Sequence, residues 1–265
     1  MPARRSPQGN PDFMAGLGKG LAVIECFDDE HSQLTIAGAA AKTGLSRAAA
    51  RRCLLTLQEL GYVDYDSNVF RLTPRVLRLG YAYIASSELP QIIQPYLERL
   101  SGQIRESCSA SILDGGEILY IARAATKRIM SVSLGVGTRL PAYCTSMGRV
   151  LLAALDPDEA AKRIASLRRT QFTPHTRTRK EELADILRDV HGSGYCVVDQ
   201  ELEIGLVSMA VPVLNNAGQT VAALNIGAQS ARVNAGEMAG RFLPALLAAQ
   251  KSLRPLINKT APITI

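Results

Sequence analysis

The sequence predicts an α+β protein made of a helical N-terminal domain and a larger domain built on an antiparallel sheet. Three observations lead to this prediction. Apolar residues follow helical spacing through the first part of the chain, with glycines where helices should end. Two short β-prone runs then follow one another around a turn. Further along, strand-like runs are mixed with helices, and 265 residues are enough for about two domains.

The overall composition is that of a folded globular chain. A hydrophobic fraction of 47% with 20% charged residues excludes a disordered protein. The net charge of +6 and a pI of about 9.2 favour an anionic partner. No apolar run reaches the ~18 residues of a membrane span, and residues 1–10 lack the apolar segment of a secretory signal. We therefore expect a cytoplasmic protein that makes no membrane contact.

Cysteines and histidines are too scattered to predict a chemical site. The five cysteines include no C-x-x-C pair, and the three histidines are dispersed. A disulfide framework or a zinc cluster needs closer spacing. We expect buried thiols that act as small apolar side chains, with no metal, no cofactor and no catalytic residue.

The chain begins with residues 1–12, a Pro- and Arg-rich tail that we expect to be disordered. A first helix is predicted over Leu17–Phe27. Its apolar residues share one face, which predicts that this face is buried: Leu17, Leu21, Ile24 and Phe27.

Two further helices are predicted to be joined very tightly. Thr35 can cap a helix over Ile36–Thr43, which should stop at Gly44 because glycine readily takes the left-handed conformation after a helix. Ser46 then caps a third helix that runs to about Leu60. Two helices joined across a glycine in this way are typical of a helix-turn-helix.

The third helix has an apolar face and a basic face. Its first two turns carry the polar and basic positions, and arginine can offer guanine two parallel donors in a major groove. Between His31 and Gln58 there are four basic residues and no acidic one. An ordinary solvated helix face would show a similar pattern. The inward positions are Ala50, Cys53, Leu54, Leu57 and Leu60, and the predicted DNA-facing positions are Ser46, Arg47, Ala48, Arg51 and Arg52, together with Thr35.

The next segment predicts a hairpin directly after this helix. Tyr62–Tyr65 and Val69–Leu72 are β-prone runs, and the residues between them favour a turn. A recognition helix followed by a hairpin is a winged helix, whose tip near Ser67 and Asn68 would lie against DNA. Helices over Arg75–Ser87 and Pro90–Ile104 follow; we interpret the first as a linker helix and the second as the entry to the next domain.

The second domain is predicted to mix strands and helices. Asp114–Glu117 is a strong hairpin signal, and Asn215–Gly218 is a turn between two later strands. The predicted strands are Ser109–Leu113, Ile118–Ala122, Ile129–Leu134, Tyr195–Asp199, Val207–Leu214 and Thr220–Ile226. The predicted helices are Ser146–Leu155, Pro157–Ser166, Lys180–Gly192 and Asn234–Leu253.

With these motifs in view, the chain resembles the IclR-type bacterial transcriptional regulators. The run from Ser46 to Val63 (SRAAARRCLLTLQELGYV) and the wing that ends at Pro74 look like the winged helix of that family. Leu140–Arg149 (LPAYCTSMGR) and Gly205–Val213 (GLVSMAVPV) resemble the segments around its effector pocket. The string from Cys144 to Arg149 looks most like the subgroup that controls aromatic-acid breakdown through protocatechuate and β-ketoadipate.

The resemblance implies a domain plan and partners. It implies a winged helix over residues 13–74, a linker helix over 75–88 and a GAF/profilin-like effector domain over 89–259. Double-stranded promoter DNA and a small organic acid are the implied ligands, and the implied assembly is a homodimer or a dimer of dimers.

The family's pocket positions carry over to this sequence residue by residue. Ser146 and Met147 begin the helix after the pocket loop, where a helix N-terminus can hold an anion. Ser208 stands where some members have cysteine, Asn225 and Gly227 where others have serine, and Arg149 where lysine is usual. The predicted effector contacts are Tyr143, Ser146, Met147, Arg149, Asp199, Ser208, Asn225 and Gly227.

Three alternatives remain open at this point. Cys144 could serve an enzyme as a nucleophile, but no local histidine base and no catalytic motif accompanies it. The chain could be a small-molecule-binding module without DNA activity, although Arg47 and Arg51 argue against that. It could also be a regulator of the same family that senses a different small carboxylic acid. For Arg149 a structural ion pair, and for Asp199 a strand-end role, explain the residue equally well.

Overall fold

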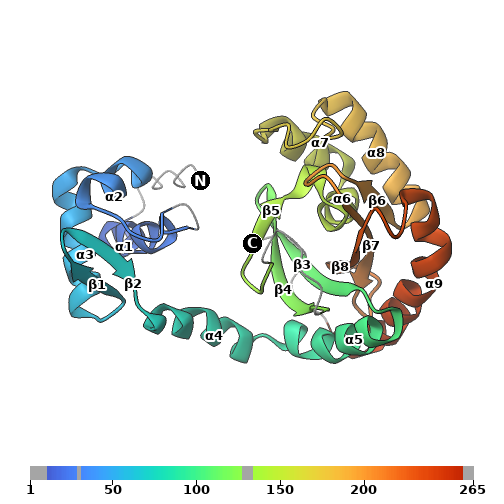
Figure 1. Ribbon diagram of the computed structural model, residues 1–265, viewed down its shortest axis with the longest axis horizontal. Helices are drawn as coiled ribbons and strands as arrows, with labels where there is room; N and C mark the ends of the chain where they lie inside the picture. The colour runs from blue at the N-terminus through green and yellow to red at the C-terminus, as the bar shows by residue number, and fades with distance from the viewer. Residues whose placement is uncertain (1–10, 29–30, 127–133, 259–265) are drawn as a thin grey trace. The chain divides into compact units, whose positions relative to one another are not determined.

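The computed structural model describes residues 11–28, 31–126 and 134–258. The chain folds as two compact units, Met1–Ala85 and Ser86–Ile265, which are described separately (Figure 1). The first is helical with a small hairpin, and the second is built on an antiparallel sheet, so the predicted α+β class is confirmed.

The first unit contains the predicted helix-turn-helix. Thr35 Oγ1 accepts a hydrogen bond from Gly38 N (3.1 Å), and Ser46 Oγ accepts one from Ala49 N (3.2 Å), so both side chains cap their helices. Gly44 has a φ of 70°, as its place after a helix requires. The elements are α1 (Ala15–Glu25), α2 (Ile36–Thr43), α3 (Arg47–Glu59), β1 (Val63–Asp66), β2 (Val69–Leu72), the 3₁₀ turn η1 (Pro74–Val76) and α4 (Leu77–Ser86).

The burial predicted for α1 is wrong at Leu17 and Leu21, whereas Ile24 and Phe27 are partly buried against the core of the unit. Leu17 and Leu21 are 60% and 45% exposed, whereas Val23 is fully buried and packs with the core of the unit. Leu60, predicted to point inward from α3, is 51% exposed because it follows the last helical residue. Helical spacing identifies an apolar stripe, but it cannot tell whether this chain or another molecule covers that stripe.

The wing is a tight hairpin anchored to the helices. Ser67 and Asn68 have φ values of 49° and 67°, the left-handed pair of a type I′ turn, which matches the twist of the strands. Phe70 of β2 is buried and forms a two-bond bridge to Leu34, just before α2, with N–O distances of 3.0 and 2.8 Å. The hairpin is therefore tied by main-chain bonds to the start of the helix-turn-helix.

The second unit is a six-stranded antiparallel sheet with strand order β5-β4-β3-β8-β7-β6. Its elements begin with a long helix. They are α5 (Glu88–Ile104), β3 (Ser107–Asp114), β4 (Glu117–Ala124), β5 (Arg139–Pro141), the 3₁₀ turn η2 (Ala142–Cys144), α6 (Ser146–Ala153), α7 (Pro157–Ser166), α8 (Lys180–Ser193), β6 (Cys196–Asp199), β7 (Leu206–Leu214), β8 (Thr220–Gln229), α9 (Ala235–Leu253) and η3 (Arg254–Leu256).

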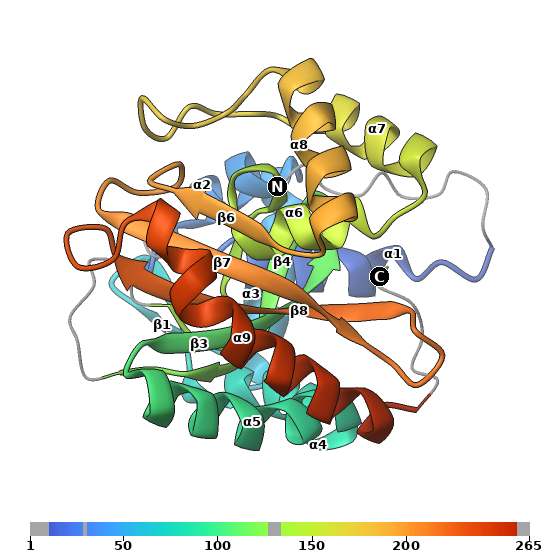
Figure 2. The same cartoon turned by 90° about the vertical axis from the view of Figure 1, so that its right-hand side faces the viewer.

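Helices cover both faces of this sheet (Figure 2). Helices α5 and α9 pack on one face through residues such as Leu97 and Phe242. Helices α6 and α8 pack on the other face through Leu151 and Leu187. Successive strand residues point to opposite faces, so each strand supplies side chains to both layers.

Element boundaries and one strand differ from the prediction. Most helices and strands start or end within two residues of the predicted positions. The short strand β5 is not among the predicted strands, because three residues are too few to show an alternating pattern. The strand predicted over Ile129–Leu134 falls almost entirely on residues 127–133, outside the described ones. In the described ranges, no helix has the length and apolar character needed to cross a membrane.

Candidate functional site

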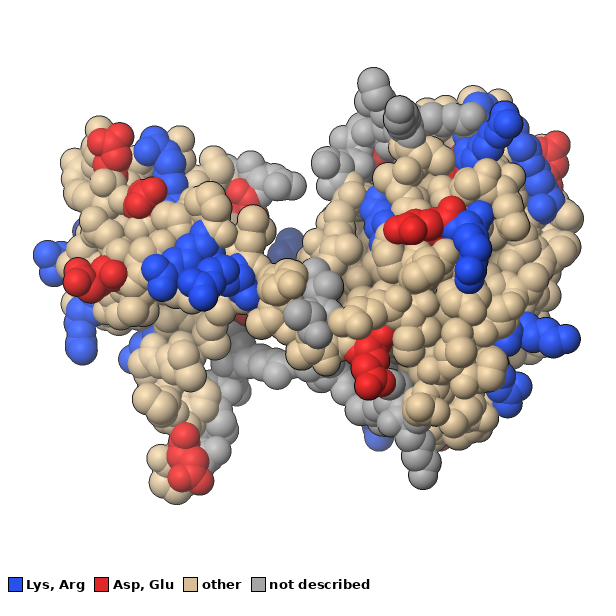
Figure 3. Space-filling view, turned by 90° about the horizontal axis from the view of Figure 1, so that it is seen from below, with Lys and Arg blue, Asp and Glu red and all other residues tan. Residues whose placement is uncertain are grey.

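The basic face of α3 is exposed and its arginines are free to bind. Arg47, Arg51 and Arg52 are exposed, and within the described residues none of their guanidinium groups has an ion-pair or hydrogen-bond partner. Arg47 and Arg51 are four residues apart and so lie one above the other on the helix. Figure 3 shows Lys and Arg side chains gathered on one face of this unit.

Three other basic residues of this unit, Lys42, Arg71 and Arg75, already contact a side chain. Lys42 Nζ lies 2.5 Å from Asp28 Oδ2, and this hydrogen bond lowers the pKa of Asp28 to about 2. Arg71 donates to Gln33 Oε1 (3.0 Å), and the Arg75 guanidinium lies over the Tyr62 ring. Arg47, Arg51 and Arg52 therefore bring three guanidinium groups without a partner together in the first half of α3.

The other residues predicted to contact DNA, Thr35, Ser46, Ala48 and Asn68, are all exposed. Thr35 and Ser46 are exposed at the first ends of α2 and α3, although their hydroxyl oxygens already cap the helices. Ala48 is exposed in the first turn of α3. Asn68 is exposed at the hairpin turn, where its Oδ1 accepts a hydrogen bond from Tyr65 (2.9 Å).

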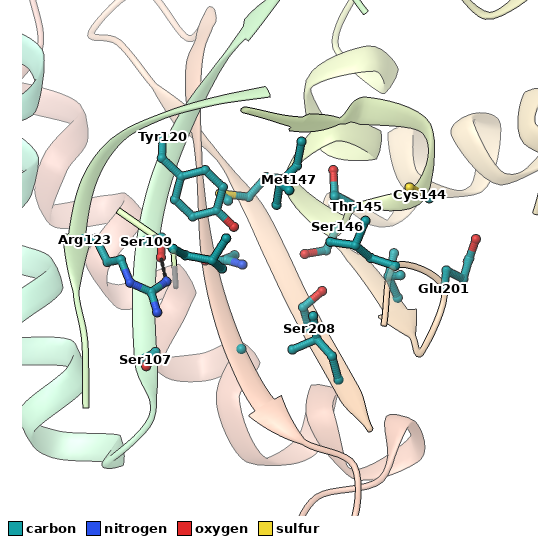
Figure 4. Close-up of a pocket in the computed structure, with 17 residues that line it drawn as sticks. Ser107, Ser109, Tyr120, Arg123, Cys144, Thr145, Ser146, Met147, Glu201 and Ser208 are labelled. Atoms are coloured by element: carbon teal, nitrogen blue, oxygen red, sulfur yellow. Dashed lines mark hydrogen bonds between the residues drawn. The ribbon is translucent and has the colours of Figure 1, made fainter. Parts of the chain in front are cut away.

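The second unit contains a cavity between the sheet and the start of α6 (Figure 4). The space between the lining residues is about 590 Å³ when the open mouth is included. Its polar lining comes from four strands and two connecting segments: Ser107 and Ser109 of β3, Tyr120 and Arg123 of β4, Cys144, Thr145 and Ser146 leading into α6, Glu201 after β6, Ser208 of β7 and Asn225 of β8. Gly227 and apolar residues such as Met147, Val198 and Leu206 complete the lining.

The period-two alternation of the strands creates this polar surface. In β3, Cys108 and Ala110 belong to the core under α5 and α9, whereas Ser107 and Ser109 face the cavity. In β8 the neighbours of Asn225 are buried in that same core. The sheet therefore presents a dry side to α5 and α9 and a partly polar side to α6.

Several buried polar atoms in this cavity have no partner. In the described part of the chain, Arg123 Nε, Ser146 Oγ and Asn225 Oδ1 are buried without a hydrogen bond. Arg123 Nη1 donates to Ser109 Oγ (3.1 Å), which turns its guanidinium toward the cavity (Figure 4). Buried polar groups are almost always satisfied, so these three atoms are available to hydrogen-bond a polar molecule that enters the cavity.

The cavity carries positive charge but no reactive nucleophile. Among the described residues that line it, Arg123 and Glu201 are the charged ones, and Glu201 is already paired with Arg149 (2.6 Å). Burial raises the pKa of the Cys144 thiol and of the Tyr120 hydroxyl to about 12. Both stay neutral near pH 7, so Cys144 lacks the thiolate that nucleophilic catalysis needs.

Five of the eight predicted effector residues line this cavity: Ser146, Met147, Ser208, Asn225 and Gly227. Tyr143 does not, because its buried hydroxyl contacts Thr170 O (2.5 Å) and Thr170 N (2.8 Å). Arg149 does not, because its guanidinium is occupied by Glu201. Asp199 is exposed, since its strand neighbour Val198 points into the cavity and Asp199 points away.

Sequence reasoning missed the polar residues of β3 and β4. Ser107, Ser109, Tyr120 and Arg123 all line the cavity. The run Ser107-Cys108-Ser109-Ala110-Ser111 alternates hydroxyl and small apolar residues, and that alternation could have indicated a strand with one polar face. The position of Arg123 has no comparable local signal, because a β-bulge between Ala110 and Ser111 shifts its register.

Two family descriptions match the chain along nearly its whole length. Residues 16–67 match the IclR helix-turn-helix domain, and residues 81–254 match the C-terminal domain of the bacterial transcriptional regulator IclR.

Characterised relatives show strong sequence similarity. The Pca regulon regulatory protein of Pseudomonas putida is 48% identical over 246 residues, which cover 92% of this chain and 84% of the relative. The p-hydroxybenzoate hydroxylase transcriptional activator of Acinetobacter baylyi is 39% identical and aligns over 93% of each chain.

Solved structures agree with this similarity. A transcriptional regulator of Rhodococcus sp. RHA1, RHA06195, is 47% identical, with a TM-score of 0.78 over 91% of this chain and 97% of its own. The inducer-binding domain of PobR from Acinetobacter, a double mutant in complex with 3-hydroxybenzoic acid, is 35% identical, with a TM-score of 0.60 over 63% of this chain and 98% of its own.

Proposed function

Because the chain belongs to the IclR family of DNA-binding transcriptional regulators, we propose that it controls genes of aromatic-acid catabolism in response to a small carboxylic acid. The family and the matched relatives are regulators and not enzymes. The unpartnered Arg123 Nε and Ser146 Oγ are the observation that carries the proposal, because both can donate a hydrogen bond to a buried carboxylate, while Asn225 Oδ1 can accept one from a hydroxyl group of the effector.

The proposed effector site is the cavity beside α6. Arg123 pairs with the carboxylate of the effector, and Ser146, Ser208 and Asn225 bind its hydroxyl or carbonyl groups. Met147 and Leu206 supply apolar walls for a ring or a short chain. The N-terminal end of α6 adds a favourable field for a negative group.

Calorimetry with the full chain tests this proposal. Protocatechuate, 4-hydroxybenzoate, β-ketoadipate and a short 2-oxo acid are titrated in turn, and we expect saturable binding of protocatechuate or one of its pathway relatives. Binding of the 2-oxo acid alone would mean a regulator of the same family that senses a different acid. No binding of any of the four would contradict an acid-sensing cavity.

We propose that α3 is the DNA-recognition helix, with Ser46, Arg47, Ala48 and Arg51 facing bases. Thr35, Arg52 and Asn68 are assigned to the DNA backbone. The support is the set of free guanidinium groups at the start of α3. Binding of the acid changes operator affinity only as far as the acid prefers one arrangement of the DNA-binding units over another.

Replacing Arg47 or Arg51 by alanine should weaken operator binding by about 1–3 kcal/mol and reduce discrimination between operator and mutant sequences, if each reads a base. Replacing Arg52 should instead weaken all DNA binding alike and lower the slope of log affinity against log salt by about one. Filter binding at several salt concentrations measures both effects. Operator affinity equal to wild type in both the Arg47 and Arg51 variants would remove α3 from this role.

We also propose that the chain works as a homodimer, or as a dimer of dimers, so that two α3 helices read half-sites about one DNA turn apart. Support comes from the apolar face of α1, where Met14, Leu17 and Leu21 are 72%, 60% and 45% exposed.

Analytical ultracentrifugation of wild type should give a multiple of the 28.5 kDa chain mass. The double variant Leu17→Glu, Leu21→Glu should associate more weakly and bind the operator less tightly, while its circular dichroism stays unchanged because neither residue is in the core. A 28.5 kDa wild-type species at micromolar concentration would contradict the proposal.

A further inference from the structure

A buried ion pair lies in the wall of the effector cavity. Arg149 of α6 and Glu201 of the loop after β6 are 3% and 7% exposed, and they form two parallel bonds, Nη1–Oε1 and Nη2–Oε2, each 2.6 Å long. Arg149 Nε donates to Tyr143 O (2.8 Å), and Glu201 Oε2 also accepts from Arg177 N (2.9 Å). Each partner therefore has its hydrogen bonds satisfied.

Arg149 and Glu201 are placed differently relative to the cavity. Glu201 is one of the residues that line it, whereas Arg149 is not. In Figure 4, Glu201 lies at the rim opposite Arg123. Without Arg149, the charge of Glu201 would cancel that of Arg123 in the cavity wall. The carboxylate of an incoming acid would then be repelled by Glu201.

The pair also holds the loop that carries Glu201. Thr173 Oγ1 donates to Gln200 O (2.7 Å), and Thr176 Oγ1 donates to Glu201 O (2.5 Å). Gln200 has a φ of 56°, a conformation that non-glycine residues seldom adopt, so other contacts must fix this loop. Through Arg149, the loop is connected to the same helix whose first residues line the cavity.

We infer that Arg149 is a positioning residue of the effector site that cancels the charge of Glu201, so that the cavity accepts an anionic ligand rather than a neutral one of the same shape. This inference rests on the proposed acid-sensing function. A purely structural pair would not need charge, since well-packed apolar residues stabilise a core equally well.

The test is a cycle of charge-removing variants in the full chain: Arg149→Met, Glu201→Gln and the two combined. Each is titrated at pH 6.5 with protocatechuate, whose carboxylate is ionised at this pH, and with 3,4-dihydroxybenzamide, whose hydroxyl groups stay protonated and which is therefore neutral, and the ratio of the two dissociation constants is compared. The uncompensated charge of Glu201 and the carboxylate of the ligand, taken as about 10 Å apart at an effective dielectric constant of about 20, change the dissociation constant by about tenfold.

We expect opposite shifts from the two single variants. Arg149→Met should favour the amide by about tenfold, because Glu201 is left uncompensated, and Glu201→Gln should favour the acid by about tenfold. The double variant should restore the wild-type ratio, and it remains informative if Arg149→Met does not fold. Arg149→Lys, which keeps the charge but loses the fork, should keep the ratio while lowering thermal stability.

A matched control removes an arginine that pairs with carboxylates elsewhere. Arg139 contacts Asp114 (2.5 Å) and Glu117 (2.8 Å), and none of the three lines the cavity, so Arg139→Met should leave the ratio unchanged. Equal changes in acid and amide affinity across the cycle would overturn the inference while leaving the acid site intact. A wild-type protein that binds neither compound would overturn the aromatic-acid proposal and this inference with it.

Discussion

Replacing Arg123 by methionine should lower the affinity for the proposed acid effector by at least about 30-fold, because truncating one partner of a buried charge pair costs about 2–5 kcal/mol or more. Arg123 is the cationic residue among the described residues that line the cavity, and its Nε has no partner there. Methionine keeps much of the side chain's length and apolar volume, so the change removes mainly the charge. Isothermal titration calorimetry of the full chain measures the loss.

Two comparisons separate this effect from damage to the fold. Arg123→Lys keeps the charge but has no planar fork, so its affinity should fall between those of wild type and the methionine variant. Operator affinity in the absence of the acid should stay at the wild-type value, because Arg123 lies in the sheet of the second unit. If Arg123→Met binds the acid as tightly as wild type does, the carboxylate site is elsewhere.

The smallest possible substitution at Gly148, to alanine, should destabilise the second unit by about 3 kcal/mol or more, as overpacking against atoms that cannot move does. A Cβ at this position would lie 2.2 Å from the carbonyl oxygen of Ala142 and 2.4 Å from its Cα. These are backbone atoms, and every residue of α6 is buried, so neither side can yield. The start of α6 would have to move away from η2, taking Ser146 and Met147 out of the cavity wall.

Urea denaturation followed by circular dichroism measures the change, and the acid titration measures its effect on the site. Gly240→Ala is the matched control, since Gly240 is exposed inside α9 and a Cβ added there would meet no atom within 4 Å. That substitution should stabilise the protein by about 0.5–1 kcal/mol. Equal unfolding midpoints for Gly148→Ala and wild type would show that η2 and α6 are not packed as described.

The helix-turn-helix and the wing could be predicted because their signals are local. Thr35, Gly44 and Ser46 each specify a cap within four residues, and the order of helix, helix and hairpin follows from them. The extent of α1 could be predicted to within two residues from the spacing of its apolar residues, but the exposure of Leu17 could not, because periodicity does not reveal what covers an apolar stripe.

The effector site could be predicted only in part, because its residues come from distant strands. Ser146 and Ser208 were found through a family resemblance, not through physical reasoning. The partner of Arg149 is 52 positions away in the sequence, and no local pattern connects it with Glu201. Asp199 was assigned to the cavity but faces solvent, because neighbouring residues of a strand point to opposite sides and an error of one residue exchanges the two.

The main-chain bridge between Leu34 and Phe70 limits the spacing of DNA contacts that an operator can offer. The bridge joins the hairpin rigidly to the helix-turn-helix. The proposed DNA contacts of α3 and of Asn68 therefore keep a fixed distance along the DNA axis and a fixed angle around it. One base pair inserted between them would rotate the second contact by about 35° and shift it by about 3.4 Å. Such an insertion breaks the half-site, and substitutions on the surface of the protein cannot restore it while Phe70 stays bonded to Leu34.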